Sequence, residues 1–148
     1  MHHDETRFLP YSPGQLFDLV ADVERYPEFL PWCKGARVLT RAGDTVTADL
    51  VIGYKMFRET FTSEVTLDRP RAISVAYRSG PLAHLTNAWQ FAPAPGGCDL
   101  SFHVTFDFRS RLLSAAMEPF FDKALSRMAE AFEKRAQELY GEWLEKTD

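Results

Sequence analysis

The sequence predicts a single α+β domain in which a curved, seven-stranded antiparallel sheet wraps around one long C-terminal helix. In residues 112–140, apolar side chains recur at steps of three and four, the spacing of one face of a helix. In the segments before that helix, apolar and polar side chains alternate with period two, as in antiparallel strands with one buried face. The helix needs a large partner surface for its apolar face, and the sheet supplies one. The length suits one domain, to which we assign residues 1–148.

The predicted domain begins with a strand and two short helices. Thr6–Leu9 is the first strand candidate. Ser12 then begins a helix, because it can cap the first turn and Gln15 completes a capping box with it. Residues 22–33 form a loop or a broken helix that two prolines interrupt. The aromatic side chains of that segment must either pack or bind something.

Six further strands follow, separated by turn signals rich in glycine, proline and aspartate. Each carries its apolar residues at every second position. We expect these strands at Ala36–Arg41, Val46–Tyr54, Phe57–Leu67, Ile73–Tyr77, Leu85–Phe91 and Leu100–Phe108.

The C-terminal helix is expected to contain one break and to end at a glycine. At 1.5 Å per residue it would be about 40 Å long if it were continuous. Pro119 removes one backbone donor, so we expect a kink or a restart there, with Leu112–Met117 as a short leading segment. Gly141 can take the left-handed conformation that ends a helix, and residues 142–148 are expected to form a tail.

Composition excludes several classes of function. The formal net charge of −4, from 17 basic and 21 acidic residues, argues against a nucleic-acid partner, and we expect no DNA binding. No apolar stretch is long enough to span a membrane, and the start of the chain lacks a signal core. We expect a cytoplasmic protein of the bacterial type, at most peripheral to the inner membrane. Cys33 and Cys98 are then free thiols rather than a disulfide.

Signals for catalysis or metal binding are weak. His84 and His103 lie on the solvent side of their strands, without an acid or a cysteine at motif spacing. We therefore expect no metal site, no cofactor and no catalytic residue. An enzyme that encloses its substrate and uses Glu59 as a base remains the alternative.

Packing alone leaves two alternatives for the space between sheet and helix. The inward side chains either interdigitate as a solid core or line a cavity for a mostly apolar small molecule. The candidate cavity residues are those that strand parity and helix phase turn inward. They are Phe29, Trp32, Tyr54, Glu59, Phe61, Tyr77, Asn87, Trp89, Phe102, Phe106, Met117, Phe121, Leu125 and Met128.

Two of these candidates break the apolar rule. Glu59 lies between Phe57 and Phe61, and Asn87 between Leu85 and Trp89. A buried carboxylate or amide must be paired. These two residues either anchor the head group of a ligand or serve a structural hydrogen bond, a water site or the open rim.

Five segments resemble the coenzyme Q-binding START-like family over about residues 6–141. They are Val20–Val23, Tyr26–Cys33, Gly80–Leu82, Leu85–Phe91 and Met128–Gly141. The resemblance implies a helix-grip fold with a hydrophobic tunnel between the sheet and the long helix. It also implies a carrier or chaperone for ubiquinone or a similar prenyl lipid that supports respiration. Bacterial members of the family are also described as ribosome association toxins, which block the joining of the ribosomal subunits, and polyketide cyclases are more distant relatives.

Three functions follow from these observations. The first is a non-enzymatic carrier of ubiquinone or a related prenyl lipid, which would touch a membrane surface transiently during loading. The second is a protein that contacts the ribosome, against which the acidic charge balance counts. The third is a cyclase-like enzyme, which needs two or more titratable groups converging in the pocket.

Overall fold

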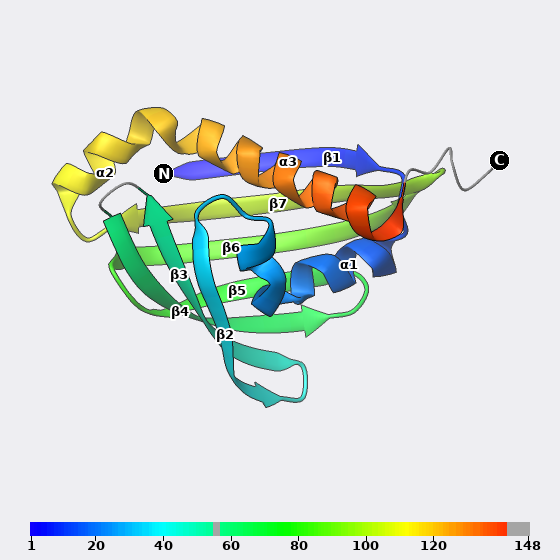
Figure 1. Ribbon diagram of the computed structural model, residues 1–148, viewed down its shortest axis with the longest axis horizontal. Coiled ribbons are helices and arrows are strands. Elements are labelled where there is room, and N and C mark those ends of the chain that lie inside the picture. Colours follow the sequence, from blue (N-terminus) through cyan, green and yellow to red (C-terminus); the bar gives the residue numbers. More distant parts are fainter. Residues whose placement is uncertain (55–56, 142–148) are drawn as a thin grey trace.

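The computed structural model of the chain describes residues 1–54 and 57–141, and within them a curved sheet with helices on one side (Figure 1). The strands are β1 His2–Leu9, β2 Cys33–Ala42, β3 Thr45–Tyr54, β4 Phe57–Asp68, β5 Ala72–Ser79, β6 Leu82–Ala94 and β7 Gly97–Phe108. The helices are α1 Pro13–Ala21, α2 Arg111–Met117 and α3 Phe121–Tyr140, with short 3₁₀ segments η1 Val23–Glu28 and η2 Glu118–Phe120. This is the predicted α+β architecture, with two short helical elements after the first strand.

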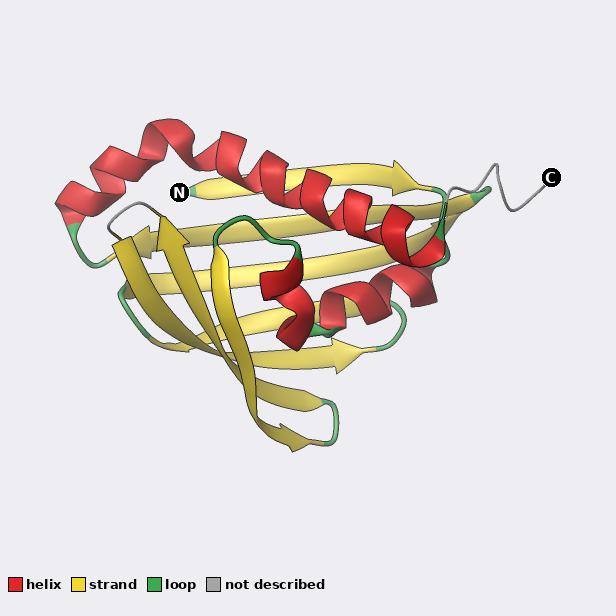
Figure 2. Cartoon of the chain, viewed as in Figure 1, coloured by secondary structure: helices red, strands yellow, loops and turns green. Residues whose placement is uncertain are grey.

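All seven strands belong to one antiparallel sheet in the order β1-β7-β6-β5-β4-β3-β2. Each hairpin from β2 to β7 pairs consecutive strands, and β1 joins the far edge by pairing with β7. The sheet curls so that its concave face meets the helices, and α3 runs along its open side (Figure 2). Thus the first strand and the long helix meet at the same edge.

The start of the chain follows its capping signals. The Ser12 hydroxyl accepts from the Gln15 backbone N–H at 3.1 Å, and the Gln15 side chain accepts from the Ser12 N–H at 3.0 Å. The capping box predicted for this position is therefore present. The strand before it is longer than predicted, because β1 begins at His2 rather than Thr6. Its first four residues, His2 to Glu5, are all polar, so hydrophobic periodicity could not reveal them.

The long helix is broken at Pro119, as predicted. α2 ends at Met117, η2 holds Pro119, and α3 begins at Phe121. Gly141 follows α3 with φ of 75° and donates its N–H to the Gln137 carbonyl, which confirms the predicted stop. Residues 142–148, for which we predicted a tail, lie outside the described residues.

Packing differs between the two ends of this helical stretch. In α3, Phe121, Ala129, Phe132 and Ala136 are buried, and Phe132 packs on Tyr26 of η1 and Trp89 of β6. In α2 and η2 no residue is buried. Phe120 and Leu139, which the helical pattern placed inward, are 59% and 51% exposed. Phe120 belongs to the separate segment η2, so its side chain does not follow the phase of α3.

Candidate functional site

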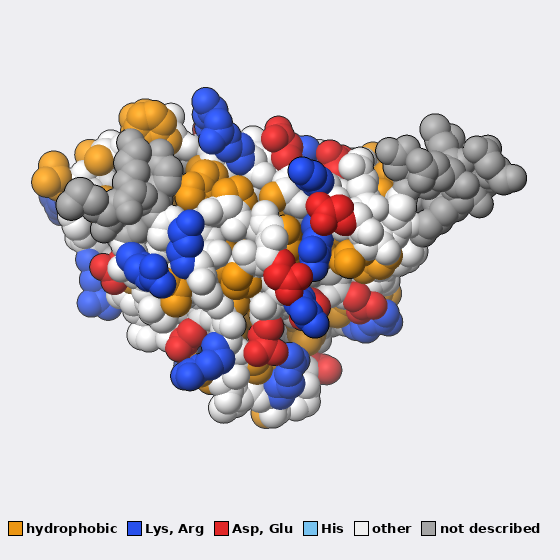
Figure 3. All heavy atoms as spheres, viewed as in Figure 1, with side chains coloured by type: hydrophobic (Ala, Val, Ile, Leu, Met, Phe, Trp, Pro, Cys, Tyr) orange, Lys and Arg blue, Asp and Glu red, His pale blue; other side chains and the backbone are white. Residues whose placement is uncertain are grey.

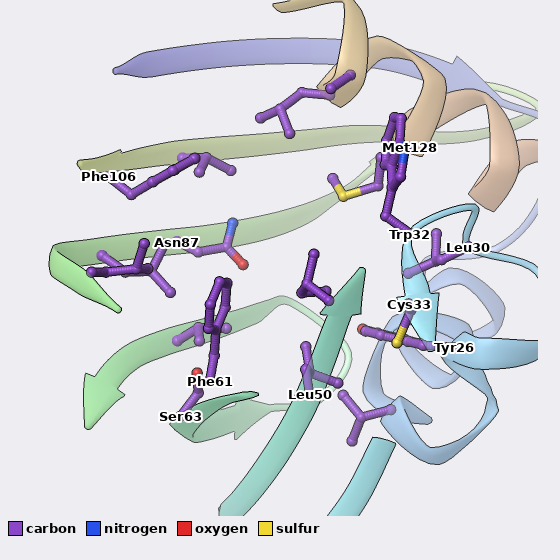
Figure 4. A pocket seen from close by; sticks show the side chains of 18 of the residues that line it. Tyr26, Leu30, Trp32, Cys33, Leu50, Phe61, Ser63, Asn87, Phe106 and Met128 are labelled. Carbon is purple, nitrogen blue, oxygen red and sulfur yellow. The ribbon is translucent and has the colours of Figure 1, made fainter. Parts of the chain in front are cut away.

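A cavity of about 590 Å³ lies between the concave face of the sheet and the first half of α3 (Figure 4). Side chains from β3 to β7 form its floor and walls, while α2, η2 and α3 supply its cover. Most of the lining is aliphatic or aromatic. The volume lies within the range of pockets that enclose a drug-sized ligand. The interior is therefore hollow at this end, which decides between the solid core and the cavity that the sequence left open.

Nine of the predicted cavity residues line this space. They come from the loop before β2, from β4, β6 and β7, and from α2 and α3. They are Trp32, Phe61, Asn87, Trp89, Phe106, Met117, Phe121, Leu125 and Met128.

Three of the predicted cavity residues, Phe29, Tyr77 and Phe102, are not part of the cavity lining. Phe29 packs on Phe132, with ring centroids 5.2 Å apart, and the Arg135 guanidinium lies 5.2 Å from its ring. Phe102 is buried beneath Trp89, with ring centroids 5.1 Å apart. The Tyr77 hydroxyl accepts from the Leu82 N–H at 3.0 Å and so holds the turn between β5 and β6. These residues pack the protein rather than line the cavity.

Glu59 is also outside the cavity lining. It pairs with Ile52 across β3 and β4, and Ile52 lines the cavity, so the predicted parity is right. Its side chain is nevertheless exposed, because this end of the hairpin runs past the enclosed space. The expectation that Glu59 lines the cavity is wrong, and its exposure agrees with a position near the open rim, which the sequence left as an alternative. The side chain of Tyr54, the remaining candidate, lies outside what the structure describes.

Asn87 lies on the wall of the cavity and is hydrogen-bonded on both sides of its amide (Figure 4). Its Nδ2 donates to the His103 carbonyl at 2.9 Å, and its Oδ1 accepts from the Trp89 indole N–H at 3.0 Å. Each amide group has further hydrogen-bonding capacity, one N–H and one lone pair. Asn87 therefore makes the structural hydrogen bonds that the sequence allowed for, and it also lines the cavity.

Ser63 is a polar lining residue that the sequence prediction missed. It lies on β4 two residues from Phe61, is only 7% exposed, and borders the cavity (Figure 4). The signal was available, because Ser63 has the same strand parity as Phe61 and Val65. A hydroxyl among apolar walls is a natural hydrogen-bonding point for a ligand.

Two more lining residues, Tyr26 and Cys33, are polar, but one is hydrogen-bonded within the protein and the other is a protonated thiol. The Tyr26 hydroxyl donates to the Val20 carbonyl, and burial raises the pKa of Tyr26. Burial also raises the pKa of the Cys33 thiol, which keeps it protonated. Neither group is poised for acid–base or nucleophilic chemistry near neutral pH.

The cavity opens beside a basic and apolar surface of the helical cover. Lys123 and Arg127, one turn apart on α3, line its rim and are exposed. Phe120 also lines the cavity and is 59% exposed, and Leu112 at the start of α2 is 83% exposed. Figure 3 shows hydrophobic side chains gathered over the α2 end of the molecule. Among the described residues, no helix is long and apolar enough to cross a bilayer.

A cluster of three potential metal ligands lies on the other face of the sheet. His2, Asp4 and His103 offer ligand atoms that all lie within 4.8 Å of one another. Sequence spacing led us to expect no metal site, whereas the structure brings together three groups that could bind an ion. Sequence spacing could not show it, because the pairing of β1 with β7 joins residues 99 positions apart.

The hollow sheet, its helical cover and its apolar lining enclose a cavity of the kind that suits a mostly apolar small molecule. Residues 9–133 match the family described as polyketide cyclase/dehydrase and lipid transport. The chain belongs to this family.

Two named relatives resemble the chain over nearly its whole length. The ribosome association toxin RatA of Pseudomonas aeruginosa is 37% identical over 141 residues, which cover 95% of this chain and 98% of that protein. The mitochondrial coenzyme Q-binding protein COQ10 homolog B of Xenopus laevis is 34% identical over 146 residues. That match covers 95% of this chain and 60% of the frog protein.

Solved structures agree on the fold. An 18 kDa protein from Caulobacter crescentus is 38% identical, with a TM-score of 0.79, over 95% of this chain and 99% of that one. A START superfamily protein from Mycobacterium smegmatis has a TM-score of 0.81 at 19% identity, over 93% and 98% of the two chains. The Zhui aromatase/cyclase from Streptomyces has a TM-score of 0.82 at 16% identity, over 93% of each chain. The fold is therefore the START-like helix-grip fold.

Proposed function

We propose that the protein is a non-enzymatic carrier of ubiquinone or a closely related prenyl lipid. The observation that carries this proposal is the cavity of about 590 Å³ with apolar walls and few polar groups. A prenyl tail is stabilised by such walls, because its burial removes apolar surface from water. The lipid transport family and the coenzyme Q-binding relative support the same ligand class.

The polar groups of the cavity suit a quinone head. Quinone oxygens accept hydrogen bonds, and the second N–H of Asn87 and the hydroxyl of Ser63 are donors on the lining. Asn87 is held in place by Trp89 and the backbone of β7, so its orientation is fixed before a ligand arrives. Preorganised donors of this kind bind with a smaller entropic cost.

The lining also favours carriage over catalysis. The described lining residues include no histidine, aspartate or glutamate. Tyr26 and Cys33 stay protonated, while Lys123 and Arg127 lie at the exposed rim. An acid–base mechanism needs groups that titrate near the working pH and converge on the substrate.

We place the loading surface at α2 and η2, where the cavity opens. Leu112 and Phe120 are large, exposed apolar side chains. The exposed cationic residues Lys123 and Arg127 follow on α3 and are attracted to anionic lipid head groups. This surface touches the membrane during lipid pickup.

A titration with a short-chain ubiquinone tests the proposal, because Trp32 and Trp89 line the cavity and report binding by fluorescence quenching. The wild-type protein should show saturable quenching. Ala124→Phe, which fills the cavity from α3, should abolish it, whereas Ala76→Phe on the exposed face of β5 should not. Absence of saturable quenching in the wild type, or equal quenching in Ala124→Phe, would contradict the proposal.

A second function is favoured by one specific observation. RatA of Pseudomonas aeruginosa matches this chain along 98% of its own length, so the whole relative is represented here. The alternative proposal is that this protein binds a ribosomal subunit and blocks subunit joining. Mixing purified 30S and 50S subunits with the protein and measuring the 70S fraction on a sucrose gradient tests it. A dose-dependent loss of 70S particles supports it, and an unchanged gradient contradicts it.

A further inference from the structure

The outer face of the sheet carries a side-chain cluster that the cavity does not use. His2 and Asp4 lie two residues apart on β1 and therefore point to the same face. Asp4 is the direct cross-strand partner of His103 on β7. The rings of His2 and His103 meet edge to face, with centroids 4.9 Å apart. The pairing of two strands in one ladder thus fixes the three backbone positions relative to one another.

We propose that His2, Asp4 and His103 form a binding site for a divalent transition-metal ion such as Zn²⁺ or Co²⁺. Two imidazoles and one carboxylate are the donor set that such ions accept. His2 Nε2 lies 2.6 Å from Asp4 Oδ2, and His103 Nδ1 lies 2.5 Å from Asp4 Oδ1. Both imidazole nitrogens already face one carboxylate. An ion bound at about 2.0–2.2 Å from each ligand would take the place of these two hydrogen bonds, with each imidazole moving away from the carboxylate.

Thr105 supports the same assignment from the other side of the two rings. Its hydroxyl oxygen lies 3.2 Å from His2 Nδ1 and 3.1 Å from His103 Nε2. A histidine that binds a metal through one nitrogen donates the N–H of the other to an outer partner. The Thr105 oxygen has two lone pairs and can accept from both rings at once. Each imidazole therefore has one nitrogen for the ion and one for a shared orienting group.

Exposure indicates what kind of metal site this is. The side chains of His2, Asp4 and His103 are 58%, 60% and 39% exposed. Three protein ligands leave at least one coordination position for water or an external ligand. The site therefore takes an ion that exchanges with solvent, and the bound ion ties the edge strand β1 to β7.

A titration of the full chain with Zn²⁺ by calorimetry, repeated with Co²⁺ by visible absorption, tests the inference. The wild type should bind one ion per chain in the micromolar range. His103→Ala and Asp4→Asn should each weaken binding by about tenfold or more, and Thr105→Val by about tenfold. His84→Ala is the matched control, because His84 lies on the same strand-paired surface and contacts its own acid, Asp107, at 3.1 Å. It should bind like the wild type.

Further readouts separate loss of the site from loss of the fold. Each variant is melted first, and only those with a cooperative transition are compared. Co²⁺ should broaden the imidazole NMR signals of His2 and His103 and leave those of His84 sharp. The inference is overturned if the wild type binds no ion below millimolar concentration. It is also overturned if folded His103→Ala binds like the wild type, or if Co²⁺ broadens His84 equally.

Discussion

The two halves of α3 face the same sheet, but one half packs into a core and the other covers the cavity. Its second half closes a solid core, in which Phe132 is 2% exposed and packs edge to face on Tyr26 and Trp89. Its first half covers the cavity together with α2 and η2. Neither α2 nor η2 contains a buried residue. Phe132 stands at the boundary, because it also lines the cavity. One helix can thus anchor the fold at one end while its other end covers a space for a ligand.

Polar contacts divide in the same way. At the solid end, Tyr140 donates to the Gln15 carbonyl, Tyr11 donates to the Gly141 carbonyl, and Arg135 pairs with Glu28 at 2.7 Å. At the hollow end, α3 meets β1 through His3, whose ring contacts Asp122 and Glu5. Some of the contacts of the hollow end therefore involve an ionisable imidazole, and their strength should depend on pH.

The largest effect is expected from truncating the solid half. Phe132→Ala should lower the free energy of unfolding by about 3–5 kcal/mol, because it leaves a hole among aromatic side chains. Leu125→Ala, over the cavity, should cost only about 1 kcal/mol, since few atoms surround that side chain. Chemical denaturation of both variants measures the difference. Equal losses would mean that the two halves are packed alike.

In the segment before β2, one aromatic side chain should contribute to stability and another to ligand binding. Phe29→Ser should destabilise the fold by about 2 kcal/mol, because Phe29 packs on Phe132 and under Arg135. Trp32→Ser should instead weaken binding of a short-chain ubiquinone, since Trp32 lines the cavity. Melting curves and ligand titrations on both variants separate the two roles. If Trp32→Ser leaves quinone affinity unchanged, Trp32 has no part in the site.

Head-group recognition should depend on the polar wall. Asn87→Leu should reduce affinity for ubiquinone by about 1–3 kcal/mol more than affinity for a prenyl alcohol of equal tail length. Ser63→Ala is the companion variant. It removes a lining hydroxyl without disturbing the amide bonds of Asn87 to Trp89 and β7. Parallel titrations with the two ligands measure the selectivity. Equal weakening for both ligands would assign Asn87 to the fold and not to head-group binding.

The smallest effect is a dependence on pH at the contact between β1 and α3. Burial disfavours the charged form of His3, but the bonds to Asp122 and Glu5 outweigh it and raise the pKa of His3 above 6.5. A raised folded-state pKa gives stability that is fully present below about pH 6.5 and is lost as the pH rises through the folded value. The Tm advantage of the wild type over His3→Asn should be on the order of 1–3 °C at pH 6 and shrink by pH 9. A pH-independent difference would rule out this contact as its source.

Much of this architecture could be predicted, because periodicity and caps report local burial. The succession of strands and helices along the chain, the capping box at Ser12, the break at Pro119 and the stop at Gly141 all follow from such signals. How deep a side chain lies within the cavity could not be predicted in this way. Glu59 has inward parity yet is exposed, because parity gives the face of a strand and not its distance from the end of the enclosed space. Phe29 and Trp32 likewise read as equivalent aromatics, although one packs the core and the other lines the cavity.

Long-range pairing explains what could not be predicted. The cluster of His2, Asp4 and His103 depends on β1 joining the far edge of the sheet beside β7, and no local motif encodes that contact. Hollowness is equally non-local. Alternation showed that inward side chains are buried, but whether they meet across the domain depends on the curvature of the whole sheet.

The most direct test of the central claim is to find what the hollow half holds. Wild-type protein, Ala124→Phe and Ala76→Phe are purified from respiring bacteria, extracted with organic solvent and analysed by mass spectrometry. The wild type and Ala76→Phe should release a prenyl quinone or related prenyl lipid in near-stoichiometric amount, and Ala124→Phe should release almost none. A wild-type extract without prenyl lipid, or equal amounts from all three proteins, would contradict the claim that this cavity carries the ligand.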